Sequence, residues 1–270
     1  MCQYLGVSRS GYYERIRRKP STRKQRDQEL IRCINKIFNQ SRQRYGSPRI
    51  QQALKQEGIQ CGKKRVVRLM KQIGIAAKRR TPYCITTKVD SVRPVAENLL
   101  NRQFTANRPN NVWVTDITYV PTKQGWLYLV VFIDLYSKMV VGWAMATHMR
   151  TELVLNALHM AIKRRHPTAG LMIHSDRGCQ YTSEAYQRML TKNQFICSMS
   201  RKGNCWDNAV AESFFGTMKE ELLPYKGYPN RLMAQSAIFE YIEVFYNRQR
   251  LHSAIGYTSP HLYEIESNVA

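Results

Sequence analysis

The sequence lacks an uninterrupted apolar run long enough to cross a membrane. Its longest apolar stretch, residues 127–146, is broken by Asp134, Ser137 and Lys138, whereas a membrane-spanning helix needs about 20 consecutive apolar residues. The N-terminus also has no long apolar segment of the kind found in secretory signals. We therefore expect no membrane attachment and, by default, an intracellular protein.

The seven cysteines show no paired spacing. They are scattered along the chain, odd in number and never separated as Cys-x-x-Cys. A disulfide framework or a structural zinc site requires paired spacings, so a small domain stabilised by disulfides or by zinc is excluded. Most of these cysteines are expected to be small buried hydrophobes in a reduced compartment.

Acidic residues are scarce, and the shortage is local. The chain has 42 Lys and Arg against 19 Asp and Glu, a formal net charge of +23. Residues 1–110 hold 26 of the basic residues but only 6 of the acidic ones. Such a surplus is costly unless a polyanion compensates it, and nucleic acid is the usual polyanion. A basic surface that only maintains solubility is the alternative, and the local clustering argues against it.

The basic part of the chain has helical periodicity. Residues 1–40 contain the stretch LGVSRSGYYERIRR, which is typical of the second half of a helix-turn-helix. Residues 45–74 predict a complete helical pair, in which Ser47 caps the first helix and Gly58 and Gly74 end the two helices. The second helix has an expected apolar stripe of Val66, Val67, Met70 and Ile73.

The other face of that second helix is basic. A basic helix after a short turn is the usual arrangement of a recognition helix, so we predict that this face contacts DNA. A solvated charged face on an ordinary helical hairpin is the alternative. The residues concerned are Lys63, Lys64, Arg65, Arg68 and Lys71.

A different pattern begins near residue 107, where strands and helices alternate. Runs rich in Val, Leu, Tyr and Trp predict the first three strands, and apolar periodicity predicts the helices. A mixed sheet flanked by helices is the simplest way to bury these faces, so we expect an α/β fold. The predicted order is strands 112–120, 127–134 and 139–146, helix 151–165, strand 171–174, a further helix, strand 195–199 and helix 207–222.

Three acidic residues stand in contexts suited to metal-dependent chemistry on DNA. Asp116 lies within a strand, Asp176 follows a strand, and Glu212 lies on a helix. Burying the charge of Asp116 between Val114 and Ile117 is expensive without a partner or a metal ion. Two Mg²⁺ ions held by converging carboxylates activate the attacking oxygen and stabilise the leaving oxygen in phosphoryl transfer.

The spacing of these acids is weak support by itself, since other acids are available. Asp134 stands in a similar context and is a reserve candidate for the site. Lys219 shares a helical face with Glu212, which places a cation beside the predicted metal site. A weak charge pair on an exposed helix is the alternative reading of that face. His174, two residues before Asp176, is expected to be structural, because magnesium favours oxygen ligands.

Six motifs together resemble the second-reading-frame (OrfB) transposases of bacterial insertion sequences, the IS-three family, within the retroviral-integrase-like DDE superfamily. They cover nearly the whole chain, and six motifs in the right order are far more specific than three acids. In chain order they are LGVSRSGYY, RYGSPRI, WVTDITY, HSDRGCQY, SRKGNCWDNAVAESFFGTMKEE and YNRQRLHSAIGYTSP.

The resemblance implies an RNase-H-like catalytic core with Asp116, Asp176 and Glu212 as ligands of two Mg²⁺ or Mn²⁺ ions, and Lys219 as a DNA contact. It implies helix-turn-helix modules before about residue 80. The zinc module of the retroviral branch has no counterpart, since no His/Cys spacing of that kind exists. We expect the domains to be a basic partial helix-turn-helix at 1–40, a helix-turn-helix module at 41–80, a linker at 81–104, and the core with its helical extension at 105–265.

The expected function is DNA transposition, in which strands are cut at the element ends and joined to a target. The expected partners are double-stranded DNA, further copies of the chain, and the upstream-frame product, to which the family commonly fuses its transposase by frameshifting. The expected location is the bacterial cytoplasm, at the nucleoid. A non-catalytic DNA-binding regulator and a DNA nuclease on the same fold are the alternatives. Arg201 and Lys202 are further predicted phosphate contacts; Trp113, Trp126 and Trp143 are predicted core residues.

Overall fold

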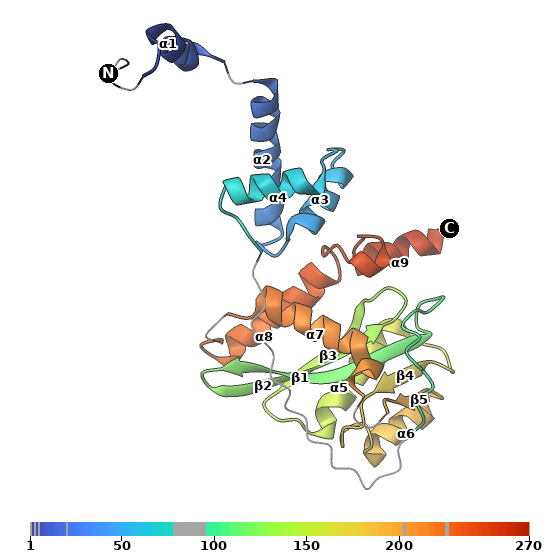
Figure 1. The fold of residues 1–270 in the computed structure, drawn as a ribbon. Helices are drawn as coiled ribbons and strands as arrows, with labels where there is room; N and C mark the ends of the chain where they lie inside the picture. Colours follow the sequence, from blue (N-terminus) through green and yellow to red (C-terminus); the bar gives the residue numbers. More distant parts are fainter. Residues whose placement is uncertain are drawn as a thin grey trace. The chain divides into compact units, whose positions relative to one another are not determined.

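The computed structural model describes residues 2, 4, 6–19, 21–77, 96–201, 204–224 and 227–269. The chain forms two compact units, Met1–Lys78 and Arg79–Ala270, whose elements are drawn in Figure 1. The predicted DNA contact Lys202 and most of the predicted linker lie outside the described residues.

The first unit is helical. Its elements are α1 (Arg9–Arg17), α2 (Thr22–Gln40), α3 (Ser47–Gln56) and α4 (Lys63–Gln72). Gly58 and Gly74, at φ +79° and +69°, follow α3 and α4, as expected for residues that end helices in the left-handed conformation. Helix α1 buries no residue. Helices α2, α3 and α4 share one core of Leu30, Ile34, Ile37, Phe38, Ile50, Leu54, Val66, Leu69 and Met70.

One detail of the predicted stripe on α4 is wrong. Val67 is 46 % exposed, and Leu69 is fully buried in its place. Positions 66, 69 and 70 follow the i, i+3, i+4 spacing of one helical face, whereas position 67 lies a full 100° from position 66. The sequence contains apolar residues at both positions, and only the packing against α2 and α3 selects between them.

The second unit is built on a five-stranded mixed sheet, which confirms the predicted fold class. Strands β1, β2 and β3 form an antiparallel meander, and β4 and β5 run parallel to β1, giving the spatial order β3-β2-β1-β4-β5. The strands are β1 (Val112–Thr122), β2 (Gly125–Asp134), β3 (Val140–Ala146), β4 (Met172–Ser175) and β5 (Ile196–Met199).

Helices cover both faces of this sheet (Figure 1). One face buries Trp113, Val130 and Phe132 against α5 (Thr151–Arg165) and α6 (Glu184–Lys192). Gly142 lets α5 approach closely, because a Cβ atom there would stand 2.4 Å from the carbonyl oxygen of Ala157. The other face is covered by α7 (Ala209–Leu222) and α8 (Arg231–Phe239), which both contact β1.

The chain after α8 closes the unit. It contains a π-helical segment (Glu240–Tyr246), a short 3₁₀ turn (Ser253–Ile255) and α9 (Pro260–Val269). The Asn247 amide pairs with the backbone of Val140 on the outer strand β3, donating to its carbonyl oxygen and accepting from its N–H group. None of the described helices is long and apolar enough to span a membrane.

Two of the three predicted core tryptophans are buried and one is not. Trp113 is fully buried and Trp143 is 9 % exposed, but Trp126 is 49 % exposed, so that prediction is wrong. Trp126 pairs with Pro121 next to the hairpin turn that joins β1 and β2, and stacks edge-on against Tyr119, with ring centroids 4.8 Å apart. Side chains alternate in the same way at the middle and at the end of a strand, so the alternation does not predict that Trp126 is exposed.

Candidate active site at the acidic cluster

Asp116 lies near the centre of β1, paired in register with Val131 of β2. Its Oδ1 accepts a hydrogen bond from the backbone N–H of Ile117, 2.7 Å away. The pKa of Asp116 is raised well above its ordinary value, first by burial and then by the negative charges of Asp176 and Glu212. Asp176 and Glu212 therefore both act electrostatically on Asp116, although 59 residues separate Asp116 from Asp176 and 35 separate Asp176 from Glu212 in sequence.

Asp176 reaches this site because β4 runs parallel to β1 and adjoins it, with His174 opposite Val114. The backbone N–H of Gly178 donates to Asp176 Oδ1 over 2.9 Å. A Cβ at position 178 would stand 3.0 Å from that oxygen, so the glycine leaves room for the turn. Burial raises the pKa of Asp176, and the Gly178 hydrogen bond opposes this rise.

Glu212 lies in the first turn of α7 and its side chain is exposed. The start of this helix is tied to β1, because Asn208 Nδ2 donates to the carbonyl oxygen of Thr115, 3.2 Å away. Although the residue is exposed, partial burial of its carboxyl group raises the pKa of Glu212. Lys219 lowers the pKa of Asp116, so this cation also acts on the cluster, and its Nζ stands 4.9 Å from the centre of the Tyr119 ring.

The cluster offers only oxygen donors, the ligands that Mg²⁺ and Mn²⁺ prefer. Within the described part of the chain, no three His, Cys, Asp or Glu side chains are placed so that they could already hold a metal ion. The pKa of each of the three carboxyl groups is nevertheless raised, and a divalent cation offsets the cost of ionising carboxylates in such a site. The donor chemistry thus fits the metal that the sequence predicts.

The reserve candidate and the neighbouring histidine have structural contacts. Asp134 is fully buried and accepts from the N–H groups of Asn110 (2.7 Å) and Tyr136 (2.9 Å). His174 is also fully buried, with Nδ1 2.9 Å from Ser198 Oγ and Nε2 3.2 Å from Ser200 Oγ. Burial lowers the pKa of His174 to about 4, so this histidine is neutral at physiological pH.

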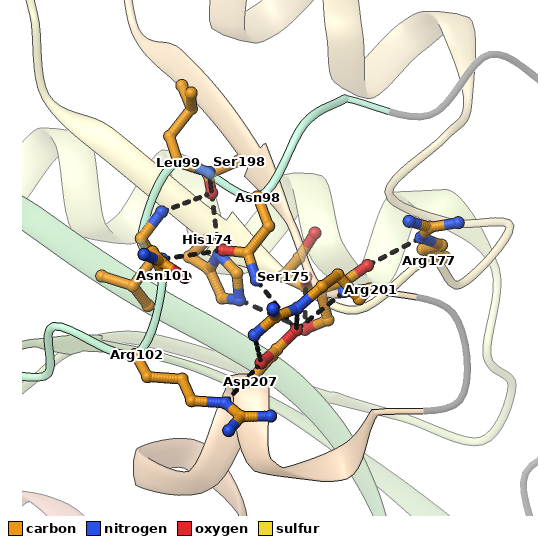
Figure 2. Close-up of polar contacts among 12 residues, drawn as sticks. Asn98, Leu99, Asn101, Arg102, His174, Ser175, Arg177, Ser198, Arg201 and Asp207 are labelled. Atoms are coloured by element: carbon orange, nitrogen blue, oxygen red, sulfur yellow. Dashed lines mark hydrogen bonds and ion pairs between the residues drawn. The ribbon is translucent and has the colours of Figure 1, made fainter.

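Asp207 is a buried acid that the sequence patterns did not single out. Figure 2 shows its carboxylate facing the side chains of Asn98, Arg102 and Arg201. Hydrogen bonds to Arg201 are the main reason that the pKa of Asp207 is held well below its usual range. The only local signal was its position in the WDNA stretch before the Glu212 helix, and its partners lie up to 109 residues away.

The cations predicted to contact DNA are placed in two different ways. Lys63, Lys64 and Lys71 are exposed on α4. Arg65 and Arg68 instead donate to Asp27 of α2 over 2.8 and 2.7 Å, a pairing that the sequence did not predict. These two helices line a basic cleft of about 490 Å³, formed by Thr22, Arg23, Arg26, Lys64, Arg65 and Arg68.

The loop before α7 makes a contact that the sequence did not predict. Arg201 pairs with Asp207, and its side chain is 49 % exposed, so part of its guanidinium still faces solvent. Asn204 precedes the 3₁₀ turn Cys205–Asn208 but makes no side-chain capping bond there. Trp206 is 69 % exposed.

Comparisons with known proteins identify the two units. A family described as "Integrase core domain" matches residues 106–205, and a second family with the same description matches residues 193–260. An "HTH-like domain" family matches residues 25–83, which include α3, α4 and most of α2. The two integrase-core matches together span Asp116, Asp176 and Glu212.

Relatives that match over nearly their full length are proteins of insertion elements. The chain is 46 % identical to the insertion element IS600 uncharacterized 31 kDa protein of Shigella sonnei, covering 96 % of both chains. It is 40 % identical to the transposase InsF for insertion sequence IS3A of Escherichia coli strain K12, covering 98 % of this chain and 92 % of the relative.

Among solved structures, an integrase-containing assembly shares the fold. A chain of the simian T-cell lymphotropic virus intasome, solved in complex with PP2A regulatory subunit B56 gamma, matches with a TM-score of 0.50 and 17 % identity. The match covers 86 % of this chain and 74 % of that one. This likeness confirms that the mixed sheet and its helices form the RNase-H-like fold expected from the sequence. From its near-complete match to InsF, this chain belongs to the IS3 family of insertion-sequence transposases and is a DNA transposase.

Proposed function

We propose that Asp116, Asp176 and Glu212 are the catalytic triad of this transposase and hold two Mg²⁺ or Mn²⁺ ions during strand cleavage and strand transfer. The proposal is supported by the convergence of three acids from β1, the residue after β4 and the first turn of α7, where Asp176 and Glu212 both act electrostatically on the buried Asp116. The negative charges of Asp176 and Glu212 disfavour ionisation of the buried Asp116, and divalent cations offset such an accumulation of negative charge.

The three acids and Lys219 have different roles in this proposal. Asp116 presents its carboxylate from within β1 and Asp176 from the residue after β4, and Glu212 completes the donor set from a helix. Lys219, which already acts on Asp116, holds a DNA phosphate next to the cluster. When bound, the two metal ions activate the attacking oxygen and stabilise the leaving oxygen of the phosphodiester. No covalent bond between protein and DNA is required.

We further propose that the first unit recognises the element ends. Residues 41–80 serve as the helix-turn-helix module, 81–104 as the linker and 105–265 as the catalytic core. The exposed lysines of α4 contact backbone phosphates, with Arg65, Arg68, Arg201 and Lys202 as further contacts. Because two DNA ends must be joined, the active species is a homo-oligomer on DNA, with the upstream-frame product as a further partner or fusion.

Strand cleavage and joining on a labelled duplex that carries the element's end tests this proposal. The assay compares the wild type with Glu212→Gln, in Mg²⁺ or Mn²⁺. We expect metal-dependent cleavage and joining in the wild type, loss of both in Glu212→Gln, and unchanged duplex binding. Glu220→Gln is the matched control, because it removes the same charge from the same helix outside the cluster.

The other outcomes separate the alternatives. Cleavage without joining would favour a nuclease, and binding without chemistry in either protein would favour a regulator. Repeating the assay with the upstream frame fused distinguishes a regulator from a chain that needs that fusion. Full activity of Glu212→Gln would remove Glu212 from the triad.

A further inference from the structure

The carboxylate of Asp207 is the centre of a buried joint in the second unit. It is fully buried and accepts five hydrogen bonds from three residues. Arg201 supplies three of them, from its backbone N–H (3.0 Å), Nε (2.9 Å) and Nη2 (2.8 Å). Asn98 Nδ2 (2.8 Å) and Arg102 Nε (3.0 Å) supply the others. We call this group the Asp207 joint.

The joint adjoins Glu212 and Asp116 through the chain that follows it. Asp207 lies in the 3₁₀ turn that leads directly into α7, five residues before Glu212. The next residue, Asn208, donates to the carbonyl oxygen of Thr115, which immediately precedes Asp116. A shift of Asp207 would therefore move the first turn of α7 relative to β1.

The joint adjoins Asp176 through the chain that precedes Arg201. Ser200 donates its N–H group to the carbonyl oxygen of Ser175 over 2.9 Å. The carbonyl oxygen of Ser200 accepts from Arg177 Nε over 2.7 Å. Ser175 and Arg177, which Figure 2 labels beside Arg201, flank Asp176 on both sides, so the position of Arg201 is linked to that of the second acid.

The joint is also connected to residues 96–102, the first described residues of the second unit. Residues 96–102, which we call the strap, supply Asn98 and Arg102 to the joint. The strap also lies on β5, because the N–H groups of Leu99 and Leu100 both donate to Ser198 Oγ, at 3.0 and 3.2 Å. Ser198 Oγ in turn contacts His174. Deleting the strap would leave Asp207 with Arg201 as its only partner in the joint.

We infer that Asp207 is a positioning residue of the acidic cluster, because its joint connects the segments that carry Asp116, Asp176 and Glu212. The role requires an ionised carboxylate. All five donors are N–H groups that point at its two oxygens, and an asparagine would place an NH₂ group against some of them. The inference rests on the proposed triad but concerns Asp207, which lies outside the proposed metal ligands and DNA contacts.

The test uses the full chain and compares Asp207→Asn with the wild type. Mn²⁺ affinity is measured calorimetrically without DNA, and cleavage and joining are measured at saturating duplex over a range of Mn²⁺ concentrations. We expect both Mn²⁺ affinity and the rate at saturating duplex to fall by roughly 10- to 100-fold, the usual effect of losing an outer-shell partner of a metal site. Duplex affinity should stay close to the wild-type value.

Three variants keep the inference falsifiable even if Asp207→Asn folds poorly. Arg102→Ala removes one contact from a half-exposed residue and should give a smaller loss, near tenfold, that Arg102→Lys partly restores. Asp134→Asn is the matched control, since Asp134 is equally buried and pairs with Arg165 and two N–H groups outside the joint. It should lower the thermal midpoint without changing Mn²⁺ affinity.

The outcomes distinguish this inference from the proposed function. Wild-type Mn²⁺ affinity in folded Asp207→Asn and Arg102→Ala would overturn the inference, as would an equal loss of affinity in Asp134→Asn. A wild-type chain that binds Mn²⁺ but neither cuts nor joins DNA, even with the upstream frame fused, would overturn the proposed function alone. A wild-type chain that binds no Mn²⁺ would overturn both, because no metal site would exist for Asp207 to position.

Discussion

At the scale of single residues, Asp116 carries the clearest conflict between stability and function. Burial and the negative charges of Asp176 and Glu212 raise the pKa of its carboxyl group. The folded protein therefore keeps this proton to a higher pH than the unfolded chain, which releases it near 3.8. The folded state binds more protons within that window, so its stability falls as pH rises through it.

Replacing Asp116 by asparagine should relieve this conflict. In EDTA at pH 8, we expect Asp116→Asn to raise the thermal midpoint by about 2–4 °C, the shift that roughly 1 kcal/mol produces in a domain of this size. The gain should shrink as the pH is lowered towards 4, where the wild-type carboxyl group is protonated. Calorimetry over this pH range measures both effects, and cleavage activity should be lost in the same variant.

A lower midpoint for Asp116→Asn at pH 8 would show that the ionised carboxylate supports the fold. Asp207 should behave in the opposite way. Its pKa is held below the usual range by Arg201, so its contribution to stability is present above pH 4 and is lost as the pH falls through its lowered folded-state pKa.

At the scale of elements, the last turn of α7 is secured by a buried ion pair. Arg250 donates to Glu221 through Nε and Nη2, and the Tyr241 hydroxyl donates to the same carboxylate over 2.8 Å. The Arg250 and Glu221 side chains are only 4 % and 7 % exposed. Removing one partner leaves an uncompensated buried charge, which is far more costly than losing a surface pair.

We expect Arg250→Ala to lower the free energy of unfolding by about 3–5 kcal/mol. The double variant Glu221→Leu/Arg250→Met should recover most of this loss, because it removes both charges and restores apolar packing. Urea unfolding measures the change. Arg188→Ala breaks the exposed pair with Glu184 and serves as the control, with an expected change within about 0.5 kcal/mol. An equal loss in both single variants would contradict this account.

Helix α4 allows a second test at this scale. Lys64 lines the basic cleft beside α2, and each phosphate contact contributes about −0.9 to the slope of log affinity against log salt. Lys64→Ala should therefore reduce the slope for duplex binding by about one. Arg32→Ala removes the same charge from an exposed position on α2 outside the cleft and should leave the slope unchanged. Equal effects would mean that only net charge matters.

At the scale of the whole molecule, the two units differ sharply in charge. Most of the excess basic residues precede residue 110, and the acidic cluster lies in the second unit. This division predicts that DNA affinity and chemistry can be separated. A chain of residues 96–270, which retains the strap, should keep metal-dependent cleavage but bind the element's end much more weakly than the full chain.

Shortening the chain further should affect the chemistry itself. Residues 105–270 lack Asn98 and Arg102, and also the buried Leu100, which is 3 % exposed. We expect this fragment to show a lower thermal midpoint and lower Mn²⁺ affinity than residues 96–270. Calorimetry on both fragments measures the difference, and identical behaviour would show that the strap contributes nothing to the core.

Local patterns were sufficient to predict most elements of the fold. Residues 151–165 were predicted as a helix with the bounds that α5 has, and the five strands were predicted to within a few residues. Period-2 and period-3.6 patterns depend on neighbouring residues only, so they are readable from the chain. The unfavourable burial of an aspartate in a strand marked Asp116 for the same reason. The roles of the three acids stay predictions.

Contacts between distant residues were decided only by the tertiary structure. The pairs Asp27–Arg65, Arg102–Asp207 and Glu221–Arg250 join residues 38, 105 and 29 positions apart, and none of them follows a local period. Trp126 shows the converse, since its strand pattern indicated burial but its side chain is 49 % exposed. By itself, the sequence determined where strands and helices form and which acids are conspicuous. The tertiary structure decided which charges meet, because pairing depends on distances that only the packed sheet and helices set.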